Sequence, residues 1–289
     1  MTSVGTKKKV GLALGGGGAK GLAHIGVIKE LERMGIEISF ISGTSMGALV
    51  GAWYAATKDI DALEKLFLGV TKDGIFPVGK IIRKHDGNVF KDPMVPAFYE
   101  SRLDGIMFDE CKIPFKAVAT DVKNGNQVVL GEGKVMDAVR ASAALPIVFN
   151  PVEIEGRILM DGGFVNPVPA DVVKEMGADI VIAVDVSSKW IDFSEMRFDL
   201  LHMHSIVSGA MSVVEYQVAK KILKENADIV LNPAVLSYNW LEFNNAKELI
   251  LCGKKETHLH REEIGKRTGH RLAEKSSFET FMDFILYSD

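Results

Sequence analysis

The sequence predicts an α/β fold, a parallel sheet with helices on its faces. A strand, a loop and a helix follow one another twice between Val10 and Lys58. Apolar strands then recur along the chain, two of them after helical stretches that end in "MGA" and "ENA". Such alternation is typical of a parallel sheet covered by helices. With 289 residues, 47% of them hydrophobic, the chain can bury the core that this architecture needs.

The first strand-loop-helix unit starts at "VGLAL" (Val10–Leu14), a short apolar run bounded by glycine that predicts a buried strand. The loop "GGGGAKG" (Gly15–Gly21) follows it. The next apolar residues have the spacing of a helix: Leu22, Ile25, Ile28 and Leu31. Gly35 has the place of a C-cap residue, so the helix is expected to end there.

The second unit repeats this order. Ile38–Ile41 predicts a strand, "GTSMG" (Gly43–Gly47) a sharp turn, and "ALVGAWYAATK" a helix of small residues. The stretch from Asp59 to Pro114 is rich in Phe, Pro, Gly and charge and lacks clean strands, so we expect helices and loops that cap the sheet.

The remaining chain alternates again. A helix is expected in "MDAVRASAALP", stopped by Pro146, and "PVEIEGRILMDGG" predicts a hairpin that turns at Glu155 and Gly156 and ends at Asp161. The last third is expected to be mostly helical, with the apolar "FMDFILY" docked on the body. The other expected strands are Phe115–Val122, Gln127–Leu130, Asp179–Val186 and Asp228–Val235.

Composition excludes several classes of function. The net charge of −4 gives no electrostatic reason to expect a nucleic-acid partner. The two cysteines, Cys111 and Cys252, form no disulfide framework or CxxC pair, which favours a reducing compartment. Neither a signal peptide nor a run of transmembrane length is visible, so a cytoplasmic location is expected. "KKK" at Lys7–Lys9 could touch anionic lipid, although three lysines more often serve solubility.

The glycine loop admits two interpretations. Gly16, Gly18 and Gly21 spell G-x-G-x-x-G between a strand and a helix, the fingerprint of a dinucleotide site. That site needs an acidic residue near the end of the second strand, whereas Glu37 lies at its beginning. No G-K-[ST] follows either, so nucleotide binding is an alternative and not the favoured function.

"GTSMG" fits G-x-S-x-G, the pattern of a nucleophile elbow, with Ser45 at the strained turn. Side chains at Gly43 or Gly47 would collide in so tight a bend. In a parallel sheet this turn and the glycine loop leave the same edge, so free N–H groups of the loop could face an oxyanion formed by attack of Ser45. One such donor contributes about 2.7–4 kcal/mol. The alternatives are a packing turn and a glycine loop present only for close helix–strand packing.

A serine nucleophile needs a base. No local pattern marks any of the seven histidines as catalytic: His24, His85, His202, His204, His258, His260 and His270. Asp161, in "MDGG", ends a strand and is left uncrowded by Gly162 and Gly163. Asp121 and Asp185 also end apolar strands, so local sequence leaves the choice among these aspartates open, and Asp-Gly-Gly is also a common turn.

Taken together, "GLALGGGGAKGLAHIGVIKEL", "GTSMGALVGA", "AVRASAALPIVFNPV" and "DGGFVNPVPADVV" resemble the patatin-like phospholipases, in particular the compact bacterial members. The similarity runs from about Val10 to Val186. The resemblance implies a three-layer α/β/α sandwich with a mostly parallel central sheet, related to the catalytic domain of cytosolic phospholipase A2. We expect one such domain over residues 1–289, with the core motifs in about 10–186 and a mostly helical part in 187–289.

The resemblance also implies a Ser–Asp dyad without histidine. The nucleophile then falls on Ser45 and the general base on Asp161. The oxyanion loop falls on Gly16, Gly17 and Gly18, with Lys20 where the family has a basic residue. Five further glycines complete the motifs: Gly21, Gly43, Gly47, Gly162 and Gly163. The chain departs from many members at Ile147, where they have glycine, which predicts a slightly different loop shape.

The expected function is hydrolysis of carboxylic ester bonds in lipids, of the phospholipase A or lysophospholipase type, through an acyl-enzyme and without metal or cofactor. Burial should raise the pKa of Asp161, with Lys20 opposing that rise. Peripheral contact with a membrane is expected, and "GIFPVGKII" and "MVPAFYESRLDGIMF" could line an acyl groove or simply pack a core. The rival functions are a nucleotide-binding Rossmann-type protein and a lipid-binding signalling module without turnover.

Overall fold

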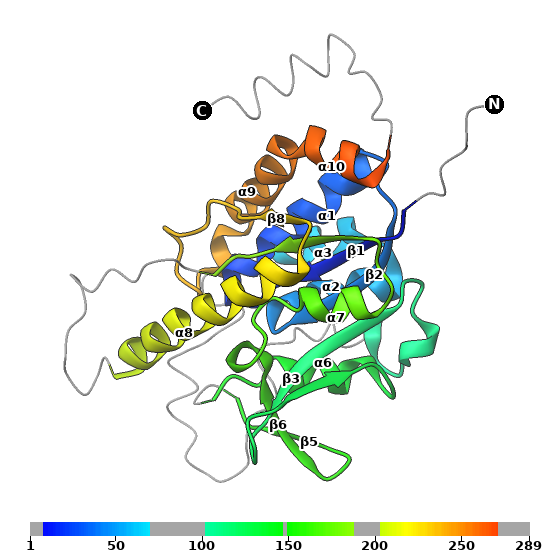
Figure 1. Ribbon diagram of the computed structural model, residues 1–289. Helices are drawn as coiled ribbons and strands as arrows, with labels where there is room; N and C mark the ends of the chain where they lie inside the picture. The colour runs from blue at the N-terminus through cyan, green and yellow to red at the C-terminus, as the bar shows by residue number, and fades with distance from the viewer. Residues whose placement is uncertain (1–7, 70–101, 147–148, 188–202, 271–289) are drawn as a thin grey trace.

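The computed structural model describes residues 8–69, 102–146, 149–187 and 203–270, without the side chains of 203–211 (Figure 1). In these ranges an eight-stranded sheet has the order β5-β6-β3-β2-β1-β7-β8, with β4 paired to β3. The strands are β1 Val10–Leu14, β2 Ile38–Thr44, β3 Phe115–Asp121, β4 Gln127–Leu130, β5 Val152–Ile154, β6 Arg157–Asp161, β7 Ile180–Val184 and β8 Ile229–Leu231.

The centre of the sheet is parallel. β1 lies between β2 and β7 and is parallel to both, and the pairs β2–β3 and β7–β8 are also parallel. At the β3 end of the sheet the pairing is antiparallel: β4 and β6 each pair with β3, and β5 pairs with β6. The β5–β6 hairpin turns where expected, with Glu155 and Gly156 at φ 50° and 75°. The predicted mostly parallel sheet is therefore confirmed.

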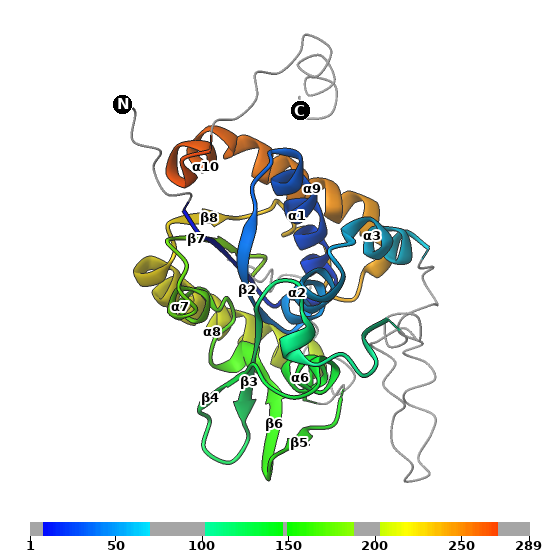
Figure 2. The same ribbon diagram turned by 90° about the vertical axis from the view of Figure 1, so that its right-hand side faces the viewer.

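Helices cover both faces of the sheet (Figure 2). One face carries α1 (Ala23–Arg33), α2 (Met46–Thr57), α3 (Ile60–Leu68), α6 (Val135–Ser142) and α9 (Ala246–Leu259), with α10 (Arg261–Thr268) against α9. The other carries α7 (Ala170–Glu175) and α8 (Met203–Asn226). Along β1, Leu12 and Leu14 belong to the first apolar core and Ala13 to the second. Because both faces are buried, the predicted three-layer α/β/α architecture is confirmed.

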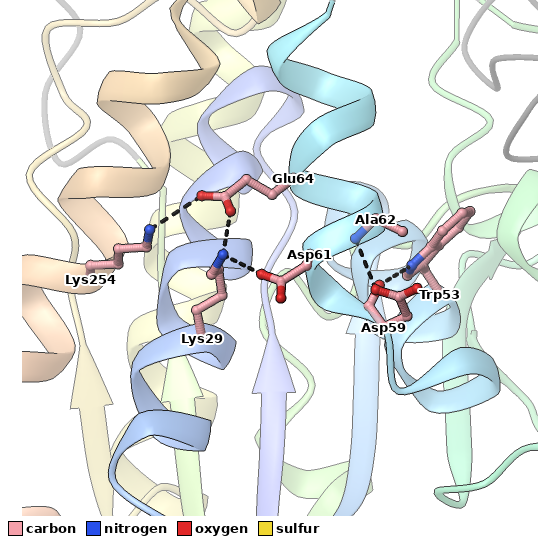
Figure 3. A network of polar contacts seen from close by, with 7 residues as sticks. All are labelled: Lys29, Trp53, Asp59, Asp61, Ala62, Glu64 and Lys254. Atoms are coloured by element: carbon pink, nitrogen blue, oxygen red, sulfur yellow. Dashed lines mark hydrogen bonds and ion pairs between the residues drawn. The ribbon is translucent and has the colours of Figure 1, made fainter.

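Helix α9 packs directly against α1, although more than 200 residues separate them in the chain. A Cβ at Gly26 would overlap the Ile250 carbonyl oxygen, and one at Gly253 would overlap the Ala23 carbonyl oxygen. The backbones of the two helices therefore touch at glycine positions. Polar contacts add to this packing, because Lys29 of α1 bonds Asp61 and Glu64 of α3, and Lys254 of α9 bonds Glu64 at 3.2 Å (Figure 3).

Several boundaries differ from the sequence-based expectation. β2 continues to Thr44, directly before Ser45. The helix in "MDAVRASAALP" ends at Ser142 and not at Pro146, because the chain turns there and the Ala144 carbonyl pairs with the Asp161 N–H at 3.0 Å. In the middle stretch, α3 packs beside α1 and α2. "GIFPVGKII", residues 94–101 of "MVPAFYESRLDGIMF", Lys7 and "FMDFILY" lie outside the described residues. Lys8 and Lys9 are described and exposed, and the Lys8 ammonium donates to the Arg267 carbonyl at 2.9 Å.

One edge of β3 is shared by two strands. β4 occupies the other edge along Ala117 to Thr120, so β2 and β6 must lie on the same edge. There Thr44 pairs with Val118, and Asp161 pairs with the next residue, Ala119. β2 and β6 therefore end against each other, which brings the residue after Thr44 next to Asp161.

Candidate active site

Ser45 lies at a strained turn between β2 and α2. Its backbone has φ 53° and ψ −119°, a conformation that a non-glycine residue rarely adopts. Thr44 and Met46 on either side are buried, whereas Ser45 is partly exposed. The turn therefore presents the hydroxyl of Ser45 as a nucleophile elbow would.

The glycines around Ser45 are required by crowding. A Cβ at Gly43 would lie 2.6 Å from the Ala48 nitrogen, and one at Gly47 would lie 2.7 Å from the Gly15 carbonyl oxygen. A Cβ at Gly21 would lie 2.7 Å from the Met46 Cβ. The elbow, the start of α2 and the glycine loop thus pack without room for side chains.

Asp161 is buried at the end of β6 and is fixed on several sides. Its Oδ1 accepts the Gly163 N–H at 2.8 Å, and its backbone carbonyl accepts the Thr120 hydroxyl at 2.7 Å. Gly162 packs onto the Val118 carbonyl of β3, where a Cβ would overlap. Interaction with the Ser45 hydroxyl lowers the pKa of the Asp161 carboxyl group, against the effect of burial, so the two side chains lie close together. A candidate nucleophile therefore lies beside a candidate base.

Burial raises the pKa of Asp161 to about 6, against the opposing hydrogen bonds from Ser45 and the Gly163 N–H. An ordinary aspartate has a pKa of about 3.9. The raised value brings Asp161 closer to the pKa that general-base catalysis at neutral pH favours. Among the described residues, Lys20 is not one of the groups that set this pKa. Instead, burial lowers the pKa of Lys20 and Glu242 partly restores it.

The glycine loop lies against Ser45, since a Cβ at Gly16 would stand 3.4 Å from the Ser45 Cβ. The Gly16 N–H donates to the Pro167 carbonyl at 2.9 Å, so it is not free to face an oxyanion. The Lys20 N–H closes the loop on the Gly17 carbonyl at 3.2 Å, and the Ala19 N–H bonds the Trp240 carbonyl at 2.7 Å. No hydrogen bond among the described residues uses the N–H groups of Gly17 and Gly18, which are the candidate donors.

The two competing aspartates, Asp121 and Asp185, hydrogen-bond within the turns that follow their strands. The Asp121 carboxylate accepts the Lys123 N–H at 2.8 Å and the Asn124 side-chain amide at 3.3 Å. Asp185 accepts the Ser187 N–H at 2.8 Å. Of the three strand-end aspartates, it is Asp161 that the structure brings to Ser45.

The histidines whose side chains are described have structural contacts. His24 is buried, and its Nε2 lies 2.7 Å from the Gly15 carbonyl oxygen. Burial lowers the pKa of His24 to about 4, so the ring is neutral and Nε2 donates. His258 contacts Glu30, His260 contacts Glu256, and His270 lies near Gly35. His85, His202 and the side chain of His204 lie outside the described part of the structure.

Two features bear on metal and nucleotide binding. Within the described ranges, no group of three His, Cys, Asp or Glu residues could hold a metal ion. Glu37 precedes β2, at the opposite end of that strand from the glycine loop, so the ribose-binding acid of a dinucleotide site is not in place.

None of the helices in the described ranges is long and apolar enough to cross a membrane.

Ser142 is a site residue that the sequence did not single out. Its hydroxyl donates to the Val118 carbonyl at 2.6 Å and accepts the Ser45 N–H at 3.0 Å. It thereby ties the elbow to β3. The buried face of α6 includes Val135, Ala138, Val139 and Ser142. The one serine in this apolar series is the sequence signal that could have pointed to Ser142.

Comparison with known proteins places this site inside a recognised sequence region. A family model described as patatin-like phospholipase matches residues 12–174, which include Ser45 and Asp161. A putative patatin-like phospholipase domain-containing protein of Caenorhabditis elegans is 31% identical over 194 residues, 63% of this chain and 17% of that protein. An uncharacterized NTE family protein of Mycobacterium bovis is 37% identical over 186 residues, 62% of this chain and 49% of that protein.

Lysophospholipase nte1 of Aspergillus fumigatus is 35% identical over 193 residues, 63% of this chain and 12% of that protein. The chain thus spans about half or less of the length of these relatives. The structure of VipD from Legionella pneumophila is similar in fold, with a TM-score of 0.51 at 14% identity over 95% of this chain and 73% of VipD.

Proposed function

The chain belongs to the patatin-like phospholipase family, and from this we propose that it is a serine acyl hydrolase that cleaves carboxylic ester bonds of lipids. The observation that carries the proposal is the placement of Ser45 beside the buried Asp161 carboxylate, which follows from the register of β2 and β6 on β3 and from the effect of the Ser45 hydroxyl on the pKa of Asp161. A nucleophile in contact with a base of raised pKa is the arrangement that covalent acyl transfer needs.

In the proposed reaction, Asp161 takes the Ser45 proton as the oxygen attacks the ester carbonyl carbon. The tetrahedral oxyanion is stabilised by the N–H groups of Gly17 and Gly18, where one donor contributes about 2.7–4 kcal/mol. Collapse expels the alcohol, which receives the proton from Asp161 and leaves an acyl ester on Ser45. Asp161 then deprotonates a water that attacks this ester, and the proton returns to Ser45 as the carboxylic acid leaves.

A lipid substrate is supported by the names of the relatives, one of which is called a lysophospholipase. Under this proposal the protein contacts a lipid surface peripherally when it binds its substrate. We further propose that residues 1–289 act as one unit. The reason is that Gly253 of α9, in the C-terminal part, packs directly against the backbone of α1, in the motif region.

The test is a panel of phospholipids, lysophospholipids and neutral glycerides assayed for released fatty acid. The wild type should release fatty acid from at least one lipid class, and Ser45→Ala and Asp161→Asn should not. Asp185→Asn is the matched control, because it changes a buried strand-end aspartate outside the site and should retain turnover. Equal fatty-acid release by wild type and Ser45→Ala would refute the proposal. Lipid binding without any release would support a binding module instead.

A further inference from the structure

A second carboxyl group approaches Asp161 from helix α8. A Cβ added at Gly163 would lie 2.8 Å from the Glu215 Oε1 and 3.1 Å from the Asp161 Oδ1. The two carboxyl groups therefore border the same small space, which is open because residue 163 has no side chain. The same glycine donates its N–H to the Asp161 Oδ1.

The packing of α8 directs Glu215 inward. Ala219, one turn later, and Leu223, two turns later, are buried in the core shared with Val168 and Val173. Val213 and Val214, by contrast, are exposed. Helix α8 thus exposes two valines while it turns Glu215 toward the protein. Desolvation of the Glu215 carboxylate costs free energy, and packing alone does not explain this arrangement.

The electrostatic partner of Glu215 is Asp161. Burial and then the charge of Asp161 raise the pKa of Glu215 to about 7. On α7, Asp171 is bonded by the Asn166 amide, and Lys174 donates to the Glu225 carbonyl, near the other end of α8. Residues one turn from Glu215 on α8 carry no charge: Ser212, Val218 and Ala219.

We propose that Glu215 is a positioning residue for Asp161, whose ionised carboxylate strengthens Asp161 as a base by like-charge repulsion. A coulombic coupling acts equally on both partners, so a charge on Asp161 that hinders ionisation of Glu215 implies the reverse effect. When Glu215 is neutral, Asp161 loses its proton more easily and is the weaker base. The consequence for the reaction rate rests on the proposed hydrolase function.

The coupling predicts a particular pH dependence. As pH rises, Asp161 first becomes ionised near pH 6, and Glu215 follows near pH 7. Turnover should therefore rise in two steps, the second one reflecting the charge on Glu215. Since a base weaker by about one pKa unit slows proton transfer roughly threefold, the second step should be of that size.

The first test is the rate of hydrolysis of a p-nitrophenyl ester between pH 5 and 9. Glu215→Gln should show one step near pH 6 and a plateau roughly threefold lower. Glu215→Asp should restore part of the second step. Glu225→Gln, the same change on an exposed position of α8, should behave as wild type. An unchanged profile in Glu215→Gln, or the same loss in Glu225→Gln, would overturn the proposal.

The second test needs no turnover. Carbon-13 NMR of the carboxyl groups in Ser45→Ala should show Asp161 with a two-step titration that becomes a single step when Glu215→Gln is added. If this change is seen in a protein without esterase activity, the coupling stands and the hydrolase proposal fails. If wild type hydrolyses esters but the Asp161 titration is unaffected by Glu215→Gln, the hydrolase proposal stands and the coupling is wrong.

Discussion

Ser45 and Asp161 meet because the strands that precede them, β2 and β6, end against each other on one edge of β3. Their pairing partners, Val118 for Thr44 and Ala119 for Asp161, are consecutive residues. The proximity of the proposed nucleophile and the proposed base is thus built into the register of the sheet. It does not depend on a flexible loop to bring the two side chains together.

Asp161 should cost the protein stability at neutral pH. Its pKa is raised to about 6 by burial, so the ionised form is disfavoured in the folded state. This penalty is absent below the unfolded pKa near 4, grows between about pH 4 and pH 6, and is fully present above pH 6. Asp161→Asn should therefore be more stable than wild type at pH 8, by up to roughly 3 kcal/mol.

Urea denaturation of wild type and Asp161→Asn at pH 4 and pH 8 measures this effect. The difference in the free energy of unfolding should be large at pH 8 and small at pH 4. Asp185→Asn, whose amide oxygen can still accept the Ser187 N–H, should not show this pH-dependent stabilisation. A pH-independent difference would contradict the buried, high-pKa state of Asp161.

Ser142→Ala should slow catalysis without preventing folding. The change removes the acceptor of the Ser45 N–H and frees the elbow to shift. Because small displacements of a reacting group are costly, kcat should fall roughly ten- to a hundredfold, with KM little changed. The matched control is Ser42→Ala, which removes a buried hydroxyl bonded to the Pro169 carbonyl. Both variants should lose about 1 kcal/mol of stability, and an equal loss of kcat in both would contradict the role of Ser142.

His24 should matter for the glycine loop and not as a base. Its Nε2 holds the Gly15 carbonyl, two residues before the candidate donor of Gly17. His24→Ala should lower kcat roughly tenfold or more by loosening the donors, whereas His260→Ala should not. Since burial keeps the pKa of His24 near 4, the pH profile of wild type above pH 5 should contain no step from this ring. Such a step, lost in His24→Gln, would contradict the assignment.

Gly26→Ala should destabilise the fold through the contact of α1 with α9. The new methyl group would overlap the Ile250 carbonyl oxygen, and backbone cannot move aside as a side chain can. The cost of such overpacking is roughly 1–3 kcal/mol, measurable by urea denaturation. Gly69→Ala is the control, because its Cβ would approach no atom closer than 3.5 Å. Equal stability of the two variants would show that α9 does not pack closely against α1 at Gly26.

Much of the fold was predictable because the signals are local. Short apolar runs bounded by glycine located the strands, and Glu155-Gly156 located the hairpin turn. The strained turn at Ser45 follows from glycines two residues to either side. The boundary of α6 was not predictable, because it depends on the pairing of Ala144 with Asp161, which are distant in sequence.

The site was predictable only in part for the same reason. Choosing Asp161 over Asp121 and Asp185 required either a family resemblance or the register of β3. Ser142 and Glu215 act through partners about 100 and 54 residues away in sequence, so no local pattern connects them to Ser45 or Asp161. The engagement of the Gly16 N–H with Pro167 likewise appears only once the chain is folded.

The most direct test of the Ser45–Asp161 site is covalent labelling with a fluorophosphonate, mapped by peptide mass spectrometry. We predict one adduct on Ser45 in wild type, a rate of labelling at least about a thousandfold lower in Asp161→Asn, and unchanged labelling in Asp185→Asn. An adduct on another residue, or equally rapid labelling of Ser45 in Asp161→Asn, would contradict the account.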